Sequence, residues 1–237
     1  MYSFTVVKDL ILTVSKKQKM AAPVVKNMNA FDANTIAFSG LRKNSKGGKM
    51  VYINVNGESK AFFELPVLRA PFGLSSYTDQ TSGNVSYSLD VSLEDNDTLA
   101  KIREIESLVL EYVCKNSDEL LGRKYSEEVI KQALFKSCIR ESKDGKYAPT
   151  LKLKVMHRDG VLSVKTYDSA KNQIELETLQ KGQRVKTIVD FNQIWIVDNK
   201  FGISVRLKQV MTLPTTELNG CAFSDDFVEQ VVNDDSE

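Results

Sequence analysis

The sequence predicts a mainly β protein with a helical insertion. Two observations support this. Apolar and polar residues alternate at period 2 before about residue 95 and again after about residue 150, and apolar residues recur every three or four positions between them. With 237 residues, 42% hydrophobic and 27% charged, the chain is long enough for one large domain or two small ones. The order of strands, helices and strands favours a single β-rich body.

The first strands are expected between residues 35 and 65. Residues 35–39 and 50–55 are rich in β-branched and aromatic side chains, which favour strands. Asn56-Gly57 is a typical two-residue hairpin turn, so residues 60–65 should return beside 50–55. Residues 40–49 hold four cations and three glycines, which predicts a mobile basic loop.

Residues 85–93 alternate strictly over nine positions, which predicts a half-buried antiparallel strand. An amphipathic helix is then expected over residues 97–115, with apolar positions at Leu99, Ile102, Ile105, Val109 and Val113. After a connection in which Gly122 ends a helix, Ser126 is a good N-cap for a second helix that reaches about Ile139. The helical insertion therefore spans about residues 97–139.

Strands resume after the polar loop 140–149. Residues 151–156 alternate, Asp159-Gly160 predicts a hairpin turn, and residues 161–167 return. Further strands are expected at 174–179, 185–189 and 193–197. Asp198-Asn199-Lys200 turns the chain into a well-alternating last strand, 201–208.

The charge of the chain is distributed unevenly. The total is near neutral at +1, but residues 215–237 carry seven acidic side chains and no Lys or Arg. Residues 1–214 therefore form a body with 32 basic and 24 acidic side chains, followed by an acidic tail. This asymmetry points to a polyanionic partner with which the tail competes; the alternative is a flexible terminus that only aids solubility. The tail residues singled out are Asp225, Asp226, Phe227, Glu229, Asp234, Asp235 and Glu237.

Several functional classes lack support in the sequence. The three cysteines form no CxxC pair, His157 is the single histidine, and no phosphate-binding loop or HExxH motif occurs. We therefore predict a protein that is not an enzyme and has no metal or cofactor. No stretch approaches the roughly 20 apolar residues of a membrane span, and the N-terminus lacks the order of a secretory signal. We expect an intracellular, soluble protein with no membrane partner.

Cations at period 2 on two strands, together with the basic loop, suggest contacts to phosphates. Such side chains leave one face of a sheet about 6.5 to 7 Å apart; for any one pair the alternative is an ordinary solvated face. Binding of single strands also needs aromatic rings on which bases stack; the alternative for those rings is the core. The candidate phosphate contacts are Arg42, Lys43, Lys46, Lys49, Lys152, Lys154, Arg206 and Lys208. The candidate stacking residues are Phe62, Phe63, Phe72 and Tyr77.

Three segments resemble single-stranded DNA-binding proteins of large double-stranded DNA viruses. They are Ala70-Pro71-Phe72-Gly73-Leu74-Ser75, the transition near 93–99, and 201–207. Those proteins are similar in plan to the phage T7-type protein, an OB-fold body with an acidic C-terminal tail. The resemblance implies an OB-fold-like barrel with two inserted helices and extra strands over residues 1–214, and a flexible tail over 215–237. One departure is that the T7-type tail ends in an aromatic residue, whereas the last aromatic here is Phe227.

The first hypothesis is a sequence-independent single-stranded DNA-binding protein for viral DNA replication, recombination or repair. It would act in the host cytoplasm or nucleus where viral DNA replicates, and its tail would compete with DNA or dock replication proteins. A homodimer is compatible with the sequence. The second hypothesis is a virion structural or assembly protein with a β-rich body. A metal-ion nuclease ranks last, because the carboxylates of the body show no recognisable spacing.

Overall fold

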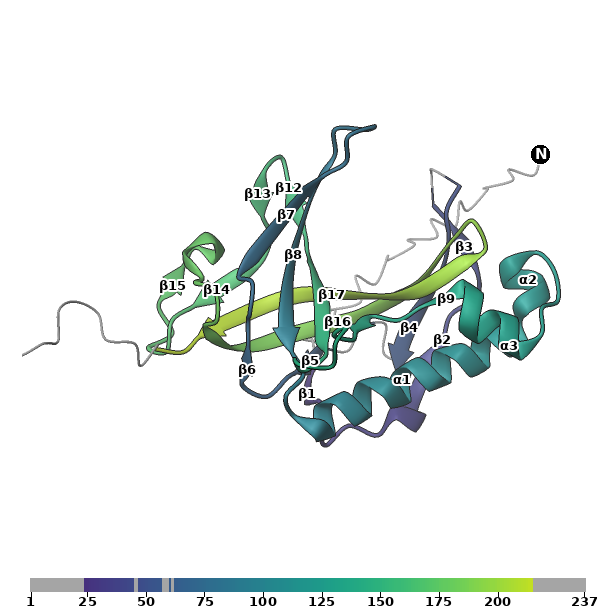
Figure 1. Ribbon diagram of the computed structural model, residues 1–237, viewed down its shortest axis with the longest axis horizontal. Coiled ribbons are helices and arrows are strands. Elements are labelled where there is room, and N and C mark those ends of the chain that lie inside the picture. The colour runs from purple at the N-terminus through teal and green to yellow at the C-terminus, as the bar shows by residue number, and fades with distance from the viewer. Residues whose placement is uncertain (1–23, 45–46, 57–59, 61, 215–237) are drawn as a thin grey trace, which may run out of the picture.

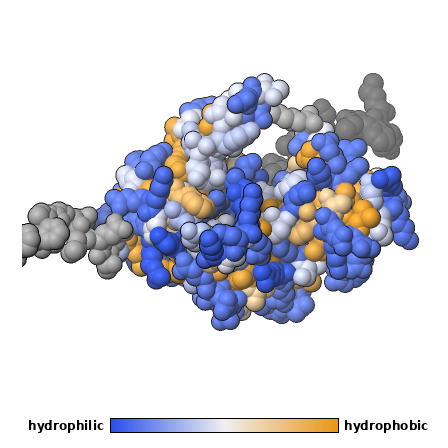
Figure 2. Space-filling view, viewed as in Figure 1, coloured by the Kyte–Doolittle hydropathy of each residue, from blue (hydrophilic) through white to orange (hydrophobic). Residues whose placement is uncertain are grey.

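The computed structural model describes residues 24–44, 47–56, 60 and 62–214. The acidic tail and Lys46 lie outside the described residues, so the predictions made for them stay predictions. On the face seen in Figures 1 and 2, hydrophilic residues cover most of the surface and hydrophobic ones form separate patches. This distribution follows from strands and a helix that each turn one apolar face inward.

A long hairpin forms the centre of the molecule. Strand β16 (Arg184–Val197) pairs antiparallel with β17 (Lys200–Thr212), and in Figure 1 the pair runs lengthwise across the body. Asp198 and Asn199 connect them with φ angles of 49° and 61°. Two successive left-handed residues are what a type I′ turn requires, and Asp and Asn tolerate this conformation. The predicted segments 185–189 and 193–197 are thus parts of one strand.

Three strands follow one another along the free edge of β16, all antiparallel to it. They are β4 (Lys49–Val55), β5 (Phe62–Glu64) and β6 (Leu68–Arg69). The hairpin predicted at Asn56-Gly57 is therefore wrong, because β4 and β5 run in the same direction. Asn56 does have a left-handed φ of 48°, but the chain continues along β16 instead of turning back. Pairing with a long neighbouring strand outweighs the local preference of the dipeptide.

The other edge of the hairpin carries parallel partners. Along β17 lie β9 (Phe135–Lys136), β11 (Thr150–Val155) and β14 (Lys165–Tyr167). Strand β8 (Val85–Ser92) pairs antiparallel with both β11 and β6. Strands β16, β17, β11, β8 and β6 thereby close into a ring of five with one parallel pair. This ring matches the five-stranded barrel of an OB fold, and the predicted mainly β class is confirmed.

The remaining strands extend this barrel or form short hairpins. The predicted Asp159-Gly160 turn is confirmed, with φ angles of 50° and 79° between two short paired strands. The predicted strand 174–179 is instead a two-residue strand followed by a 3₁₀ turn. The short elements are β1 (Val25–Asn27), η1 (Ala33–Thr35), β2 (Ile36–Phe38), β3 (Arg42–Lys43), β7 (Leu74–Thr78), β10 (Ile139–Arg140), β12 (His157–Arg158), β13 (Val161–Leu162), β15 (Gln173–Ile174) and η3 (Leu176–Thr178).

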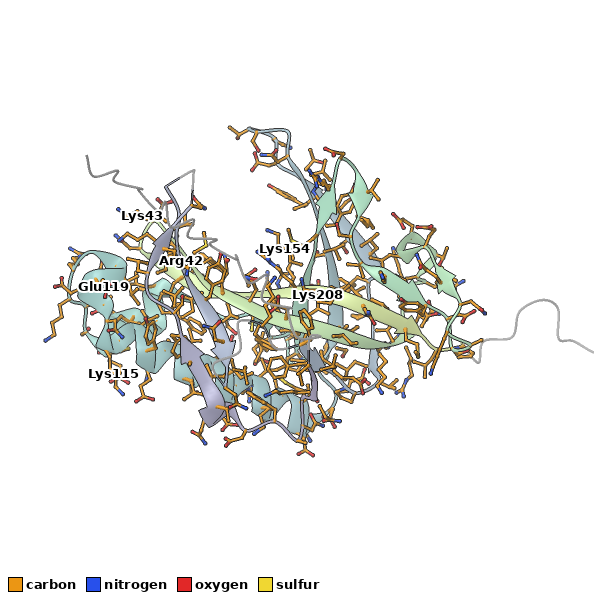
Figure 3. The ribbon with its side chains drawn as sticks, turned by 180° about the vertical axis from the view of Figure 1, so that it is seen from behind. Arg42, Lys43, Lys115, Glu119, Lys154 and Lys208 are labelled. Atoms are coloured by element: carbon orange, nitrogen blue, oxygen red, sulfur yellow. The ribbon has the colours of Figure 1, made fainter. Side chains whose placement is uncertain are left out.

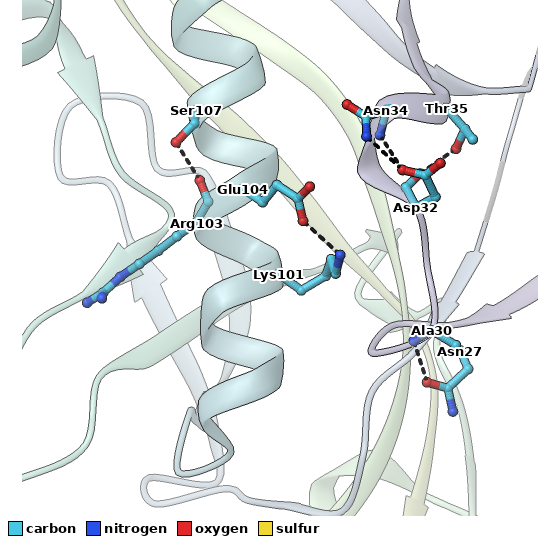
Figure 4. A network of polar contacts seen from close by, with 9 residues as sticks. All are labelled: Asn27, Ala30, Asp32, Asn34, Thr35, Lys101, Arg103, Glu104 and Ser107. Carbon is cyan, nitrogen blue, oxygen red and sulfur yellow. Dashed lines mark hydrogen bonds and ion pairs between the residues drawn. The ribbon is translucent and has the colours of Figure 1, made fainter.

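Helix α1 (Asn96–Lys115) confirms the first predicted helix. Asp95 caps it by accepting a hydrogen bond from the Thr98 amide at 2.8 Å, and the Thr98 hydroxyl also donates to Asn29. The apolar stripe from Ile102 to Val113 is fully buried. Figure 4 shows the nearby polar contacts, including the cap of η1 by Asp32 and the Lys101–Glu104 ion pair.

The second predicted helix is much shorter than expected. Ser126 does cap it, but α3 (Glu127–Val129) passes into a π-helical turn, η2 (Ile130–Leu134), and ends there. Residues 135–136 become strand β9 because they pair with β17, where the Phe135 ring lies 5.5 Å from that of Phe201. Gly122 ends a helix as predicted, with φ of 82° after α2 (Ser117–Leu121).

Candidate nucleic-acid interface

The strands of the barrel wall have an apolar inner face and a polar outer face. Leu89, Leu153 and Val205 point inward and are buried. Residues directly opposite each other in a ladder share a face. Ser88 is paired with Lys154, Lys154 with Arg206, and Arg206 with Asp190, so these four form one outer row across β8, β11, β17 and β16.

A groove of about 360 Å³ lies on this outer face. Among the residues that line it, every charged one is a cation, and two are aromatic. In Figure 3, Lys154 lies close to the β16–β17 hairpin, on which Lys208 is labelled, at the middle of the molecule. The lining residues are Ser86, Tyr87, Ser88, Lys136, Ser137, Cys138, Arg140, Lys152, Lys154, Trp195, Ile203, Ser204 and Val205.

Gly202 explains how Trp195 and β9 reach the groove. Gly202 is paired with Trp195 and with Lys136. A Cβ atom at Gly202 would lie 2.4 Å from the Lys136 carbonyl oxygen and 2.9 Å from the Trp195 ring. Glycine therefore lets strand β9 and the indole approach the backbone of β17 from two sides. The indole is half-buried and part of it lines the groove.

Two buried carboxylates lie among the outer-face cations. Asp190 is 4% exposed and lies 3.8 Å from the Lys208 ammonium, and Asp90 is 7% exposed and lies 3.7 Å from the Arg140 guanidinium. Burial raises the pKa of both carboxyl groups, while the neighbouring cations oppose that rise. One oxygen of each carboxylate is buried without a hydrogen-bond partner. The cations here are thus held near incompletely satisfied negative charge.

Phe62 and Lys208 extend this surface toward β5. The Lys208 ammonium lies 5.6 Å from the centre of the Phe62 ring, a cation–π distance, and both side chains are half-buried. Phe63 points the opposite way, as adjacent strand residues do. It is 2% exposed and packs edge-on against Phe31 and Phe191. The candidate stacking role of Phe63 is therefore corrected: its ring belongs to the core.

The described cations of the basic loop, residues 40–49, are of two kinds. Arg42 and Lys43 are exposed on β3, and the Arg42 guanidinium lies 5.5 Å from the centre of the Tyr52 ring. Lys49 instead donates to the Leu120 carbonyl at the end of α2, at 3.1 Å. That bond ties Lys49 to the helical insertion, so its ammonium is less available to a phosphate. Figure 3 places Arg42 and Lys43 on an arm away from Lys154.

Phe72 and Tyr77 are the most accessible of the predicted stacking residues. Phe72 is 54% exposed in the turn after β6, and Tyr77 is 64% exposed on β7. Tyr77 is paired with Ser86, which lines the groove, whereas Phe72 lies at the Ser92 end of β8 and lines a second cavity that shares Arg140 with the groove. The predicted residues therefore do not gather in one place.

The sequence analysis missed four groove residues: Lys136, Arg140, Tyr87 and Trp195. The expected second helix covers Lys136, the expected polar loop 140–149 covers Arg140, and Trp195 is flanked by two isoleucines. The period-2 pattern of 193–197 does place Trp195 on the face opposite Ile194 and Ile196, which are both buried. That alternation was the available signal.

Within residues 24–214, as far as the structure describes them, no cluster of three or more His, Cys, Asp or Glu side chains is arranged to hold a metal ion. No helix in that part of the chain combines the length and apolarity needed to cross a membrane.

The comparisons with known proteins give a family and a set of similar structures. The "Family of unknown function (DUF5871)" matches residues 79–228, so the chain belongs to that family. No curated protein matches the chain.

Three solved structures of a single-stranded DNA-binding protein from bacteriophage Enc34 are similar to the chain. The complex with ssDNA is 15% identical with a TM-score of 0.42, and covers 76% of this chain and 97% of its own. The structure of that protein without ssDNA in its description is 15% identical, with a TM-score of 0.40, and covers 82% of this chain and 99% of its own. A C-terminal truncation is 14% identical, with a TM-score of 0.42 and coverage of 77% and 98%. At these scores the likeness carries no weight for function, which has to come from residues of this chain.

Proposed function

We propose that this member of the family is a non-enzymatic protein that binds single-stranded DNA without sequence preference on the outer face of β8, β11 and β17. The observation that supports this most strongly is the groove, in which all charged lining residues are cations and Tyr87 and Trp195 supply rings. Cations neutralise phosphates, and rings stack on bases, in proteins that bind single strands.

The spacing of the cations suits an extended strand. Lys152 and Lys154 are exposed and two residues apart on β11, so their side chains start about 6.5 to 7 Å apart. The rings favour a single strand over a duplex, because the faces of paired bases are already stacked inside a duplex. Every base has a π face, so stacking is tolerant of sequence.

The acidic tail fits the same proposal as an internal competitor. Its carboxylates would be attracted to the cations that phosphates use, and its apolar residues would dock replication proteins once DNA displaces the tail. We place the activity in viral DNA replication, recombination or repair, in the host compartment where viral DNA is copied. The charge asymmetry of the sequence supports the competition between the tail and DNA.

The test measures binding of labelled oligo-dT and of duplex DNA of equal length by fluorescence anisotropy, at about 50 and 200 mM salt. We expect tighter binding to oligo-dT and an affinity that falls with salt. The Lys152→Ala/Lys154→Ala double variant should lower the slope of log affinity against log salt by about 1.4, since each phosphate contact on a single strand contributes about 0.7.

Two comparisons make this test specific. Lys124→Ala removes an exposed lysine between α2 and α3, outside the groove, and should leave the affinity unchanged. A chain truncated after Leu213 should bind oligo-dT more tightly if the tail competes. No binding by either the full or the truncated chain would overturn the proposal and favour a virion assembly role.

A further inference from the structure

Three exposed arginines form a second row on the outer face of the barrel. In the ladder register Arg184 is paired with Arg69, Arg69 with Ser92, Ser92 with Thr150, and Thr150 with Arg140. Five strands, β16, β6, β8, β11 and β10, thus contribute one residue each. All three arginine side chains are exposed. This row lies at the end of β8 and β11 opposite to Ser86 and Lys154.

A cavity of about 570 Å³ opens over the part of this row that runs from Arg69 to Arg140. Phe72 and Tyr147 contribute to its wall, and their exposed fractions are 54% and 76%. Two exposed rings in one cavity offer the flat surfaces on which bases stack. Tyr147 comes from the loop between β10 and β11, and Phe72 from the turn between β6 and β7. Both rings are on segments held by strands that carry the arginines.

The cavity continues the groove. Arg140 lines both, and Lys152 in the groove and Thr150 in the cavity are neighbours on the same face of β11. Lys154 is four positions from Thr150, which corresponds to about 13 Å along a strand. A polymer that lies on Lys154 and Lys152 and follows β11 therefore arrives at Arg140 and the cavity.

The polar groups of the cavity suit a nucleotide. Arg69 is oriented by donating from Nε to the Gly182 carbonyl at 3.3 Å, which leaves the rest of its guanidinium for another acceptor. Glu141 is paired with Arg103 at 2.9 Å, so its charge is partly neutralised. Glu94 also lines the cavity and provides carboxylate oxygens, which accept hydrogen bonds from N–H groups of bases.

We propose that this cavity is a second base-binding subsite for the same DNA strand, in which Phe72 and Tyr147 stack on a base and Arg69 and Arg140 bind the flanking phosphates. This inference rests on the proposed function and adds a direction: the strand runs along β8 and β11 from the groove to the cavity. Rings beside arginines at the end of a cationic track favour this occupant over an apolar peptide, which would leave the arginines unpaired.

The test is the length dependence of binding, with dT oligonucleotides from about 4 to 16 nucleotides. For the natural chain we expect an added rise in affinity at the length at which the strand reaches the cavity. The Phe72→Leu/Tyr147→Leu variant keeps apolar bulk but removes both rings. It should lose that rise, with affinity for the longest oligonucleotide about 5- to 100-fold weaker and affinity for the shortest unchanged.

A matched variant distinguishes the loss of the aromatic rings from a structural effect of the two substitutions. Phe72→Tyr/Tyr147→Phe retains both rings and should retain the rise. If the leucine variant leaves the length dependence intact, or weakens short and long oligonucleotides equally, the second subsite is overturned. An effect of the leucine variant in the full chain that disappears after truncation at Leu213 would also overturn it, because the cavity would then hold the tail.

The experiments distinguish a wrong second subsite from a wrong proposed function. If Lys152→Ala/Lys154→Ala does not weaken binding of even the shortest oligonucleotide, the groove itself is not the binding site. If that variant weakens all lengths while the leucine variant has no effect, the groove binds DNA and only the second subsite is refuted.

Discussion

The inner and outer faces of β11 show how one strand serves two purposes. Leu151, Leu153 and Val155 point into the barrel and are buried, whereas Lys152 and Lys154 point outward and are exposed. Burial of the first set stabilises the barrel, and the second set contributes little to stability because solvated cations interact weakly with their surroundings. The difference teaches that binding and folding can be changed independently in this wall.

The largest expected effect is on the inner face. Leu153→Ala leaves a cavity in a fully buried position and should lower the free energy of unfolding by about 2–5 kcal/mol. Lys154→Ala and the charge-retaining Lys152→Arg should each change it by no more than about 0.5 kcal/mol. Urea unfolding measures both. A similar loss of stability in the lysine variants would break the distinction between the two faces.

Gly202 tests whether a close approach to the backbone of β17 positions the Trp195 indole. Gly202→Ala places a Cβ atom against the Lys136 carbonyl and the Trp195 ring, so it should cost about 1–3 kcal/mol of unfolding free energy and shift the Trp195 emission. Gly40→Ala is the matched control, because a Cβ atom there meets nothing within 4 Å. If both substitutions have the same small effect, the close approach at Gly202 does not position the indole.

The smallest effect is a pH dependence from the two buried aspartates. Their pKa values are raised in the folded protein, chiefly by burial, above the ordinary value of 3.8. The folded state therefore holds these protons more tightly than the unfolded state, and stability falls as pH rises from about 3.8 through the raised pKa values.

The Asp90→Asn/Asp190→Asn variant lacks this loss. Its stability relative to the natural chain should therefore increase as pH rises from 4 to 7, as measured by urea midpoints. Using the difference between the two proteins removes the contribution of carboxylates with lowered pKa values, such as Asp79 and Asp168, which act in the opposite direction. A difference that is independent of pH would show that burial does not control these groups.

Periodicity within a single strand or helix was sufficient to predict part of the fold and of the candidate site. The alternation of 151–156 placed Lys152 and Lys154 on one face, and the three- and four-residue spacing of 97–115 predicted α1 within one residue. These segments are long enough for the pattern to be unambiguous. The same reasoning predicted that the helical insertion lies between two sets of strands.

The rest of the fold and of the candidate site depends on contacts between strands, which the sequence of one strand does not encode. The arginine row comes from five strands, and two of these, β6 and β10, are two residues long and show no period. Asn56-Gly57 and the end of the second helix were predicted wrongly, because pairing with β16 and β17 decided both. Adjacent residues of a strand such as Phe62 and Phe63 point to opposite faces, but only the packing of Phe31 and Phe191 identifies which ring is buried.

The most direct test of the central claim is the fluorescence of Trp195 on addition of oligo-dT. Trp195 is the single tryptophan of the chain and lines the groove, so it reports contact at that place and no other. We expect saturable quenching by oligo-dT, reversed by salt and much weaker with duplex DNA of equal length. Emission that does not change while anisotropy shows oligo-dT bound would place the DNA elsewhere and contradict the account.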